Sequence, residues 1–150
     1  MQTLDLWLKN NRGNFNQELK VLACHFLKIT KAELITKGDE TISVDLARHL
    51  SASLGCLKKG IPLAYILRKK EFWSFELEVD KNTLIPRPET ELIVEKSIKL
   101  AKEKGTVLEL GTGSAAIAIA LAKERPDLQI TATDISPAAL RVAKRNLFRH

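Results

Sequence analysis

Val107-Leu-Glu-Leu-Gly-Thr-Gly-Ser-Ala115 carries the clearest structural signal in this chain. An apolar run ends in an acid, a Gly-x-Gly turn follows, and an alanine-rich segment comes next. This order is typical of a parallel strand that leads into a helix whose N-terminus lies beside a ligand. A second strand-like run, 129–133, ends next to Asp134, where a carboxylate can accept hydrogen bonds from ribose hydroxyls. Together the two features predict a site for a nucleoside-type cofactor.

The segments around this turn predict an α/β fold. Helices are expected over 88–104, 115–124 and 137–148, and strands over 106–110 and 129–133. Pro88 suits the first turn of its helix and Gly105 suits the C-terminal end, while Ser114 and Ser136 are expected to cap the next two helices. The order helix–strand–helix–strand–helix is that of the beginning of a doubly wound, Rossmann-like sheet.

The N-terminal residues predict a helical bundle instead. Leu46, Leu50 and Leu54 recur at helical spacing within residues 1–60, as do other apolar residues of this region. Thr30-Lys-Ala-Glu33 has the spacing of a capping box, which predicts the start of a short helix. No catalytic constellation occurs here, and a bundle that precedes a cofactor domain often recognises a partner.

A β-hairpin is expected between the bundle and the α/β region. From Phe75 onward apolar and polar residues alternate, which predicts a half-buried strand, and a turn at Asp80 would return the chain over 83–85 as its partner. We therefore expect three parts, a helical domain over 1–70, a hairpin linker over 71–87 and the first part of an α/β domain over 88–150.

Composition narrows the class of protein. The chain has 150 residues, a length that fits one average domain or two small ones. Of its residues 45% are hydrophobic, and its net charge is +6. We find no apolar run of ~18 residues and no secretory signal, so we expect a cytoplasmic protein without a membrane span. Scattered basic residues and few aromatic residues argue against direct nucleic-acid binding. Cys24 and Cys56 lack CxxC spacing and predict buried free thiols, and the isolated His25 and His49 predict no metal site.

Glu109 discriminates between the cofactors that such a turn can hold. Gly111-x-Gly113-x-x-Ala116 also fits the dinucleotide fingerprint with alanine in its last place. An acid two residues before the first glycine would repel the phosphates of NAD. S-adenosylmethionine has no phosphate and carries a cationic sulfonium and an amine, so the sign of the charge favours it over NAD.

Five motifs carry a resemblance to a known family. They are Gly60-Ile-Pro-Leu-Ala-Tyr-Ile-Leu67, Glu71-Phe-Trp73, Leu84-Ile-Pro-Arg-Pro-Glu-Thr-Glu91, Leu108-Glu-Leu-Gly-Thr-Gly-Ser114 and Asp134-Ile-Ser-Pro-Ala-Ala-Leu140. These motifs resemble the HemK/PrmC family, the release-factor glutamine N5-methyltransferases. The resemblance runs from about Gly60 to the last residue, and the Pro-Arg-Pro-Glu-Thr-Glu string is its most specific part, since generic methyltransferases lack it.

The resemblance implies a function and a set of site residues. It implies S-adenosylmethionine-dependent methylation of the glutamine amide in the Gly-Gly-Gln motif of peptide chain release factors, with the N-terminal bundle docking that protein substrate. The positive net charge is consistent with attraction to an RNA-rich assembly such as the ribosome. The residues implied to line the methionine part of the cofactor are Gly111, Thr112, Gly113, Ser114 and Ala115. Asp134 is implied to hold the ribose.

The sequence departs from the family pattern in two residues and in one motif. Ala115 and Arg68 stand where the family usually has glycine, and a left-handed backbone at Arg68 would cost about 1 kcal/mol. The Asn-Pro-Pro-Tyr motif, which in the family grips the substrate amide, has no match in residues 1–150, so we name no catalytic residue.

Two alternative functions remain open on the sequence. One is a methyltransferase for amino groups of nucleic acids, and the other is a partner-binding module without catalysis. Because the expected sheet has only two strands, we also expect residues 88–150 alone to be molten or prone to aggregation, and residues 1–60 to fold alone.

Overall fold

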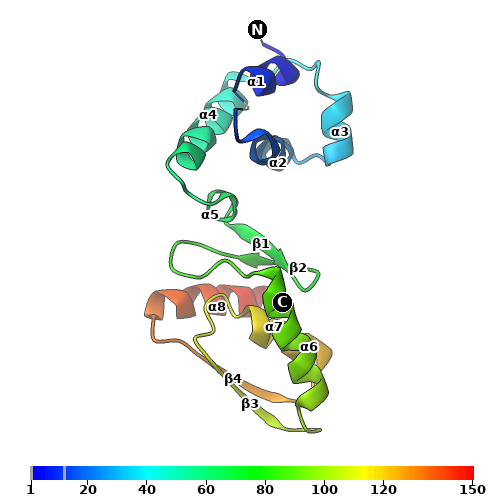
Figure 1. Ribbon diagram of the computed structural model, residues 1–150, viewed down its shortest axis with the longest axis vertical. Coiled ribbons are helices and arrows are strands. Elements are labelled where there is room, and N and C mark those ends of the chain that lie inside the picture. The colour runs from blue at the N-terminus through cyan, green and yellow to red at the C-terminus, as the bar shows by residue number, and fades with distance from the viewer. Residues whose placement is uncertain (1, 12) are drawn as a thin grey trace. The chain divides into compact units, whose positions relative to one another are not determined.

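The computed structural model describes residues 2–11 and 13–150, and the chain divides into two compact units, Met1–Leu67 and Arg68–His150 (Figure 1). The division falls between Leu67 and Arg68, directly after the last helix of the N-terminal unit.

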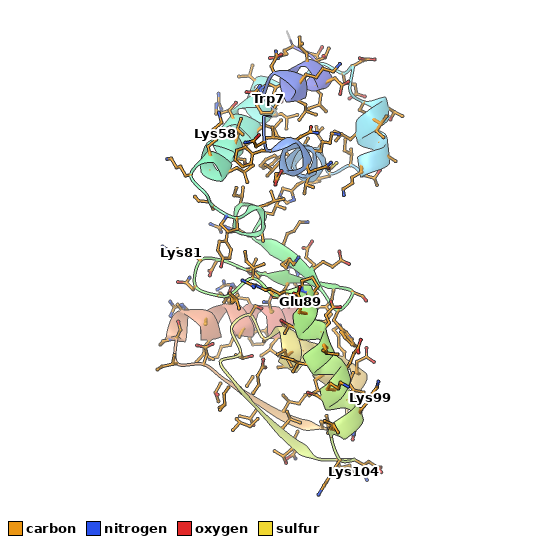
Figure 2. The ribbon with its side chains drawn as sticks, in the orientation of Figure 1. Trp7, Lys58, Lys81, Glu89, Lys99 and Lys104 are labelled. Atoms are coloured by element: carbon orange, nitrogen blue, oxygen red, sulfur yellow. The ribbon has the colours of Figure 1, made fainter. Side chains whose placement is uncertain are left out.

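The N-terminal unit consists of helices, as its apolar spacing predicts. They are α1 (Leu4–Asn11), α2 (Asn16–Leu27), α3 (Lys31–Thr36), α4 (Val44–Lys58) and the short α5 (Leu63–Leu67), which follows Pro62 and was not expected. Leu50 of α4 lies in one buried core with Leu19 and Leu22 of α2. Trp7 of α1, labelled in Figure 2, belongs to the same core. Burial of this apolar face is what holds a bundle of short helices together, because isolated helices of this length are unstable in water.

The capping box at the start of α3 is confirmed. The hydroxyl of Thr30 accepts a hydrogen bond from the Glu33 amide at 3.2 Å, and the Glu33 carboxylate accepts one from the Thr30 amide at 2.7 Å. Cys24 and Cys56 are free thiols, as expected, although both are half-buried instead of fully buried. Burial raises the pKa of the Cys24 thiol above its ordinary value.

The C-terminal unit is α/β, as predicted. Its elements are β1 (Lys69–Phe72), β2 (Phe75–Glu78), a 3-10 turn η1 (Pro88–Thr90), α6 (Glu91–Leu100), β3 (Thr106–Leu110), α7 (Ala116–Glu124), β4 (Gln129–Thr133) and α8 (Pro137–Arg149). Strands β3 and β4 are parallel, with Thr106 opposite Gln129 and Leu110 opposite Thr133, and α7 is the helix that connects them. Helix α6 packs against α7, and α8 packs against the hairpin strand β2 (Figure 1).

The hairpin has a different partner strand from the one predicted. β2 pairs with the preceding strand β1 in an antiparallel register, and residues 83–85 form no strand. The two turn residues, Trp73 and Ser74, both have left-handed backbone, with φ of 49° and 64°. A two-residue turn with positive φ at both positions matches the twist of a hairpin, but such turns usually contain glycine or asparagine, and this one contains neither. The amide of Trp73 donates a hydrogen bond to Glu91 at 2.9 Å, which helps to hold this strained turn.

The helix expected over 88–104 ends earlier, at Leu100, and Gly105 does not cap it. Ala101 is extended, and the guanidinium of Arg125 donates hydrogen bonds to the carbonyl groups of Ile98, Ala101 and Lys102. The last carbonyls of a helix lack partners within it, so a distant arginine that binds them fixes its end. A reading of nearby residues alone misses this contact.

The parallel sheet has one covered face and one open face. Along β3 and β4 exposure alternates, so that every second residue is at least half-buried. On the open face Leu108 is 61% exposed and Leu110 is 78% exposed. These apolar side chains agree with the expectation that a two-stranded sheet leaves part of its surface uncovered.

Candidate functional site

The candidate site is the loop Gly111–Ala115 between β3 and α7, where the backbone turns sharply. Gly111, Gly113 and Ala115 have left-handed backbone, with φ of 73°, 56° and 64°. A Cβ built on either glycine would meet no atom within 4 Å, so the space beside both glycines is open. The glycines are therefore required for their backbone conformation, and they leave an open face on which a ligand can approach the main chain.

Asp134 joins this loop to the end of the neighbouring strand. Its carboxylate accepts hydrogen bonds from the Gly113 amide and from the Ser136 amide, both at 2.9 Å. Because the carboxyl ends of parallel strands lie at the same edge of a sheet, the predicted glycines and the predicted acid meet here. The hydrogen bonds from Ser136 and Gly113 hold the pKa of Asp134 below its ordinary value, so the carboxylate is ionised at neutral pH.

Glu109 places a second carboxylate at the N-terminus of α7. The hydroxyl of Thr112 donates a hydrogen bond to it at 2.8 Å, and the amide of Ala118 in the first turn of α7 also stabilises it. Burial raises the pKa of Glu109, and the nearby charge of Asp134 raises it further. The helix N-terminus, which in dinucleotide-binding folds holds a phosphate, is thus occupied by the protein's own carboxylate.

The predicted loop residues do not all face the open side. Gly111 is exposed and Gly113 is half-buried, whereas the side chains of Thr112, Ser114 and Ala115 are buried. A ligand on the open face can therefore reach these three residues mainly through their backbone atoms.

Ser114 does not cap α7, contrary to the prediction. The residue directly before the helix is Ala115, and no side chain hydrogen bond caps that end through it. Ser136, in contrast, caps α8 as predicted, because its hydroxyl accepts a hydrogen bond from the Ala139 amide at 3.2 Å. The left-handed backbone at Ala115 moves the start of α7 to Ala116, one residue later than predicted. A serine before an alanine-rich segment does not reveal this shift.

Both departures from glycine fall on left-handed backbone. Arg68 has φ of 55° and an exposed side chain, and Ala115 has φ of 64° and a methyl group that is 0% exposed within the core. The left-handed region costs a residue with a Cβ about 1–2 kcal/mol. The methyl group of Ala115 points into the core beside Ala116 and Ala118, and so it does not narrow the open face of the loop.

Asn146 is a functional candidate that the sequence analysis did not identify. It is fully buried on α8 and donates a hydrogen bond to the Ser114 carbonyl at 2.9 Å. A signal was available, because Ala139, Val142, Ala143 and Asn146 follow the helical spacing of a buried face, and a polar residue in such a face needs a partner.

Other kinds of site are absent from the part of the chain that the structure describes. Among residues 2–11 and 13–150, no group of three or more histidine, cysteine, aspartate or glutamate side chains is placed to hold a metal ion. Within the same ranges, every helix is too short or too polar to span a bilayer.

Two family models match the two units of the chain. Residues 8–67 match a model described as the PrmC N-terminal domain, and residues 88–150 match one described as the methyltransferase small domain. Together they account for most of the helical unit and for the α/β unit from Pro88 onward.

Curated relatives match across the boundary between the units. The release factor glutamine methyltransferase of Vibrio cholerae is 43% identical over 130 residues, which are 86% of this chain and 46% of the relative. That of Coxiella burnetii is 47% identical over 126 residues, 83% of this chain and 46% of the relative. That of Buchnera aphidicola is 39% identical and covers 95% of this chain and 54% of the relative. The chain spans about half the length of the curated relatives it matches. With both units matched, and with sequence identity that runs through both, the chain belongs to the HemK/PrmC family.

Proposed function

We propose that this chain binds S-adenosylmethionine at the loop 111–115 and Asp134, and that the protein methylates the glutamine side-chain amide in the Gly-Gly-Gln motif of peptide chain release factors. The printed names of the relatives, release factor glutamine methyltransferases, support the reaction and its substrate. The position of Glu109 at the N-terminus of α7 is the observation that carries the choice of cofactor.

The charges around the loop fit a cofactor that is cationic near its reactive atom. Glu109 and Asp134 lie close enough for the charge of one to raise the pKa of the other. A pyrophosphate group would meet two carboxylates, whereas a sulfonium and an amine would be attracted by them. The donor set therefore fits S-adenosylmethionine and does not fit NAD.

Asp134 retains the capacity to hold a ribose while it holds the loop. Each carboxylate oxygen accepts one amide hydrogen bond, from Gly113 or from Ser136, and each has a second lone pair that can accept another. Its depressed pKa keeps both oxygens as acceptors at neutral pH. S-adenosylmethionine, when bound, would supply an activated methyl group, and the role of these residues would be to bind and orient it.

The acceptor side of the reaction is not assigned to residues of this chain. In the family the glutamine amide is gripped by an Asn-Pro-Pro-Tyr motif, and this sequence contains no two adjacent prolines. We propose that the N-terminal helical unit contributes to docking the release factor, in the cytoplasm and near the ribosome, because that unit matches the PrmC N-terminal domain.

Calorimetric titration of the 150-residue chain tests the cofactor assignment. We expect binding of S-adenosylmethionine and S-adenosylhomocysteine, and none of NAD at the same concentration. Tight binding of NAD alone would contradict the charge argument.

A methyl-transfer assay that combines a release factor with a full-length release factor glutamine methyltransferase related to this chain tests the proposed substrate. Transfer to a nucleic acid in place of the release factor would favour the first alternative. Absence of cofactor binding by the 150-residue chain would favour a binding module without catalysis.

A further inference from the structure

Asn146 is an unusual residue for its position on α8. The buried face of this helix is otherwise formed by Ala139, Val142 and Ala143, and Asn146 is 0% exposed. Burial of an amide costs free energy unless its hydrogen bonds are satisfied. An apolar residue at this position would avoid that cost, so the presence of asparagine has to be explained by the groups that its side chain contacts.

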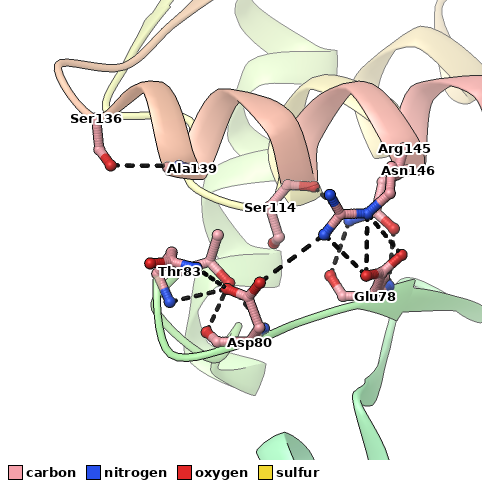
Figure 3. Close-up of polar contacts among 9 residues, drawn as sticks. Glu78, Asp80, Thr83, Ser114, Ser136, Ala139, Arg145 and Asn146 are labelled. Atoms are coloured by element: carbon pink, nitrogen blue, oxygen red, sulfur yellow. Dashed lines mark hydrogen bonds and ion pairs between the residues drawn. The ribbon is translucent and has the colours of Figure 1, made fainter.

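The Asn146 amide binds the backbone of two segments that are far apart in the sequence (Figure 3). Its Oδ1 accepts a hydrogen bond from the Glu78 amide at 2.7 Å. Its Nδ2 donates to the Glu78 carbonyl and to the Ser114 carbonyl, both at 2.9 Å. Two of these hydrogen bonds thus hold the hairpin strand β2, and the third holds the loop that precedes α7.

The Ser114 carbonyl belongs to the peptide bond that leads into the left-handed residue of the candidate site. The next residue, Ala115, has left-handed backbone that is unfavourable for a residue with a Cβ. Such a conformation persists only where the surrounding contacts enforce it. Asp134 holds the loop through the Gly113 amide, and Asn146 holds it through the carbonyl of the next residue, Ser114.

We propose that Asn146 is a positioning residue for the cofactor loop, which fixes the peptide between Ser114 and Ala115 and so sets the open face of Gly111 and Gly113 for the cofactor. This inference rests on the proposed function, because it concerns the same site. It also links the hairpin to the loop, since the same amide holds Glu78 of β2.

The adjacent Arg145 provides a contact that separates this role from simple adhesion of α8. The guanidinium of Arg145 binds the Glu78 carboxylate, with its Nη2 at 2.8 Å, and both side chains are partly exposed. Glu78→Gln weakens this ion pair but leaves the Glu78 backbone groups that Asn146 binds. It is therefore a matched control on the same two elements.

The test measures S-adenosylhomocysteine affinity by calorimetry in the 150-residue chain. Asn146→Asp has the same shape and still offers an oxygen to the Glu78 amide, but it lacks the NH2 group that serves both carbonyls. We expect affinity to fall on the order of tenfold in Asn146→Asp, as the loss of a buried hydrogen-bond donor implies, and less than about twofold in Glu78→Gln.

A second readout separates positioning from general destabilisation. Val94→Ala removes buried apolar atoms from α6, in the core that also contains Ala115, but it breaks no hydrogen bond to the loop, and so it serves as a control of lowered stability. We expect hydrogen exchange of the peptide 111–116, without ligand, to accelerate in Asn146→Asp more than in Val94→Ala at equal distance below each melting temperature. If Asn146→Asp does not fold, Asn146→Ser is measured instead, because it introduces no charge and is expected to lose affinity in the same way.

The outcomes distinguish the two levels of the argument. Wild-type binding together with unchanged affinity in the folded Asn146 variant would overturn the positioning role and leave the proposed function standing. No binding by the wild-type chain would overturn both. Equal losses of affinity in Asn146→Asp and Val94→Ala would also overturn the positioning role, since stability alone would then explain the effect.

Discussion

Replacement of Glu109 by glutamine should weaken cofactor binding and at the same time raise the stability of the fold. Glutamine has the shape of glutamate, and its side-chain oxygen can still accept the hydrogen bond from Thr112 that is 2.8 Å long in the structure. The substitution therefore keeps the shape and the acceptor for Thr112, and it removes the negative charge and one of the two acceptor oxygens. A unit charge within about 6 Å of a carboxylate is worth about 2–3 kcal/mol at an effective dielectric constant of about 20. Solvent screening reduces this, so we expect S-adenosylmethionine to bind about tenfold more weakly.

The effect of Glu109→Gln on stability should have the opposite sign. Because burial raises the pKa of Glu109, folding disfavours the ionised form of this side chain. That cost is absent below the pKa of the unfolded carboxyl group and is fully present above the pKa in the folded protein. The variant should therefore match the wild type in melting temperature near pH 4 and exceed it at pH 8.

Calorimetry and thermal melting at both pH values check the two expectations. The loss of affinity should also shrink as the pH falls toward the pKa of Glu109, because the wild type then loses the same charge. A variant that binds S-adenosylmethionine as tightly as the wild type at pH 8 would refute the charge argument for the cofactor. A variant that is less stable at pH 8 would show that the carboxylate is needed to hold the start of α7.

Three further predictions concern stability, all measured by thermal or denaturant unfolding. Arg68→Gly should stabilise the protein by about 0.5–1 kcal/mol, because relief of left-handed strain exceeds the added entropy of the unfolded chain. Ala115→Gly should change stability by less than about 0.5 kcal/mol, because it also removes a buried methyl group. Equal effects of the two substitutions would contradict the role of burial. Asp127→Asn should lower the melting temperature at neutral pH, because the hydrogen bonds from Arg125 hold the pKa of Asp127 well below its usual range. The difference from the wild type should shrink as the pH falls from about 4 to about 2, since the stabilising effect of the carboxylate is complete above its unfolded pKa and declines toward its folded pKa; a difference that persists unchanged in acid would argue for packing instead. Residues 1–67 should fold alone, and Leu50→Ala within them should cost about 2–5 kcal/mol because Leu50 is fully buried; a non-cooperative melt of the wild-type fragment would contradict this.

Elements with local signals could be predicted from the sequence. The caps at Thr30 and Ser136 act over three residues, and the structure contains both. The strands 106–110 and 129–133 and the connecting helix follow from apolar runs and a glycine turn, and the glycines and Asp134 of the candidate site follow with them. For the caps, the strands and the glycine turn, the residues that decide the structure lie within a few positions of one another, and Asp134 meets the loop because parallel strands end at the same edge of the sheet.

Elements fixed by distant residues could not be predicted in this way. The hairpin turn at Trp73 lacks glycine, and its backbone is held by Glu91, 18 residues further on. The end of α6 is fixed by Arg125, whose contacts span 24 and 27 residues. Asn146 reaches the loop from a helix 32 residues away. In each case the contact that fixes the structure joins residues that are far apart in the sequence, and at Trp73 the usual local signal is also missing.

The candidate site is ordered by the protein's own groups, and this has a consequence for affinity. Asp134 holds the Gly113 amide, and Thr112 is tied both to Glu109 and, through its amide, to the Thr133 carbonyl at 2.8 Å. A loop fixed during folding does not lose that freedom again when a ligand binds, so preorganisation raises affinity without any new contact. The open sheet face at Leu108 and Leu110 lies on β3, before the loop, and no hydrogen bond that holds the loop passes through those two side chains. It follows that the 150-residue chain should retain measurable affinity for S-adenosylmethionine even where its sheet is incompletely covered, and that its stability, more than its loop geometry, should limit that affinity.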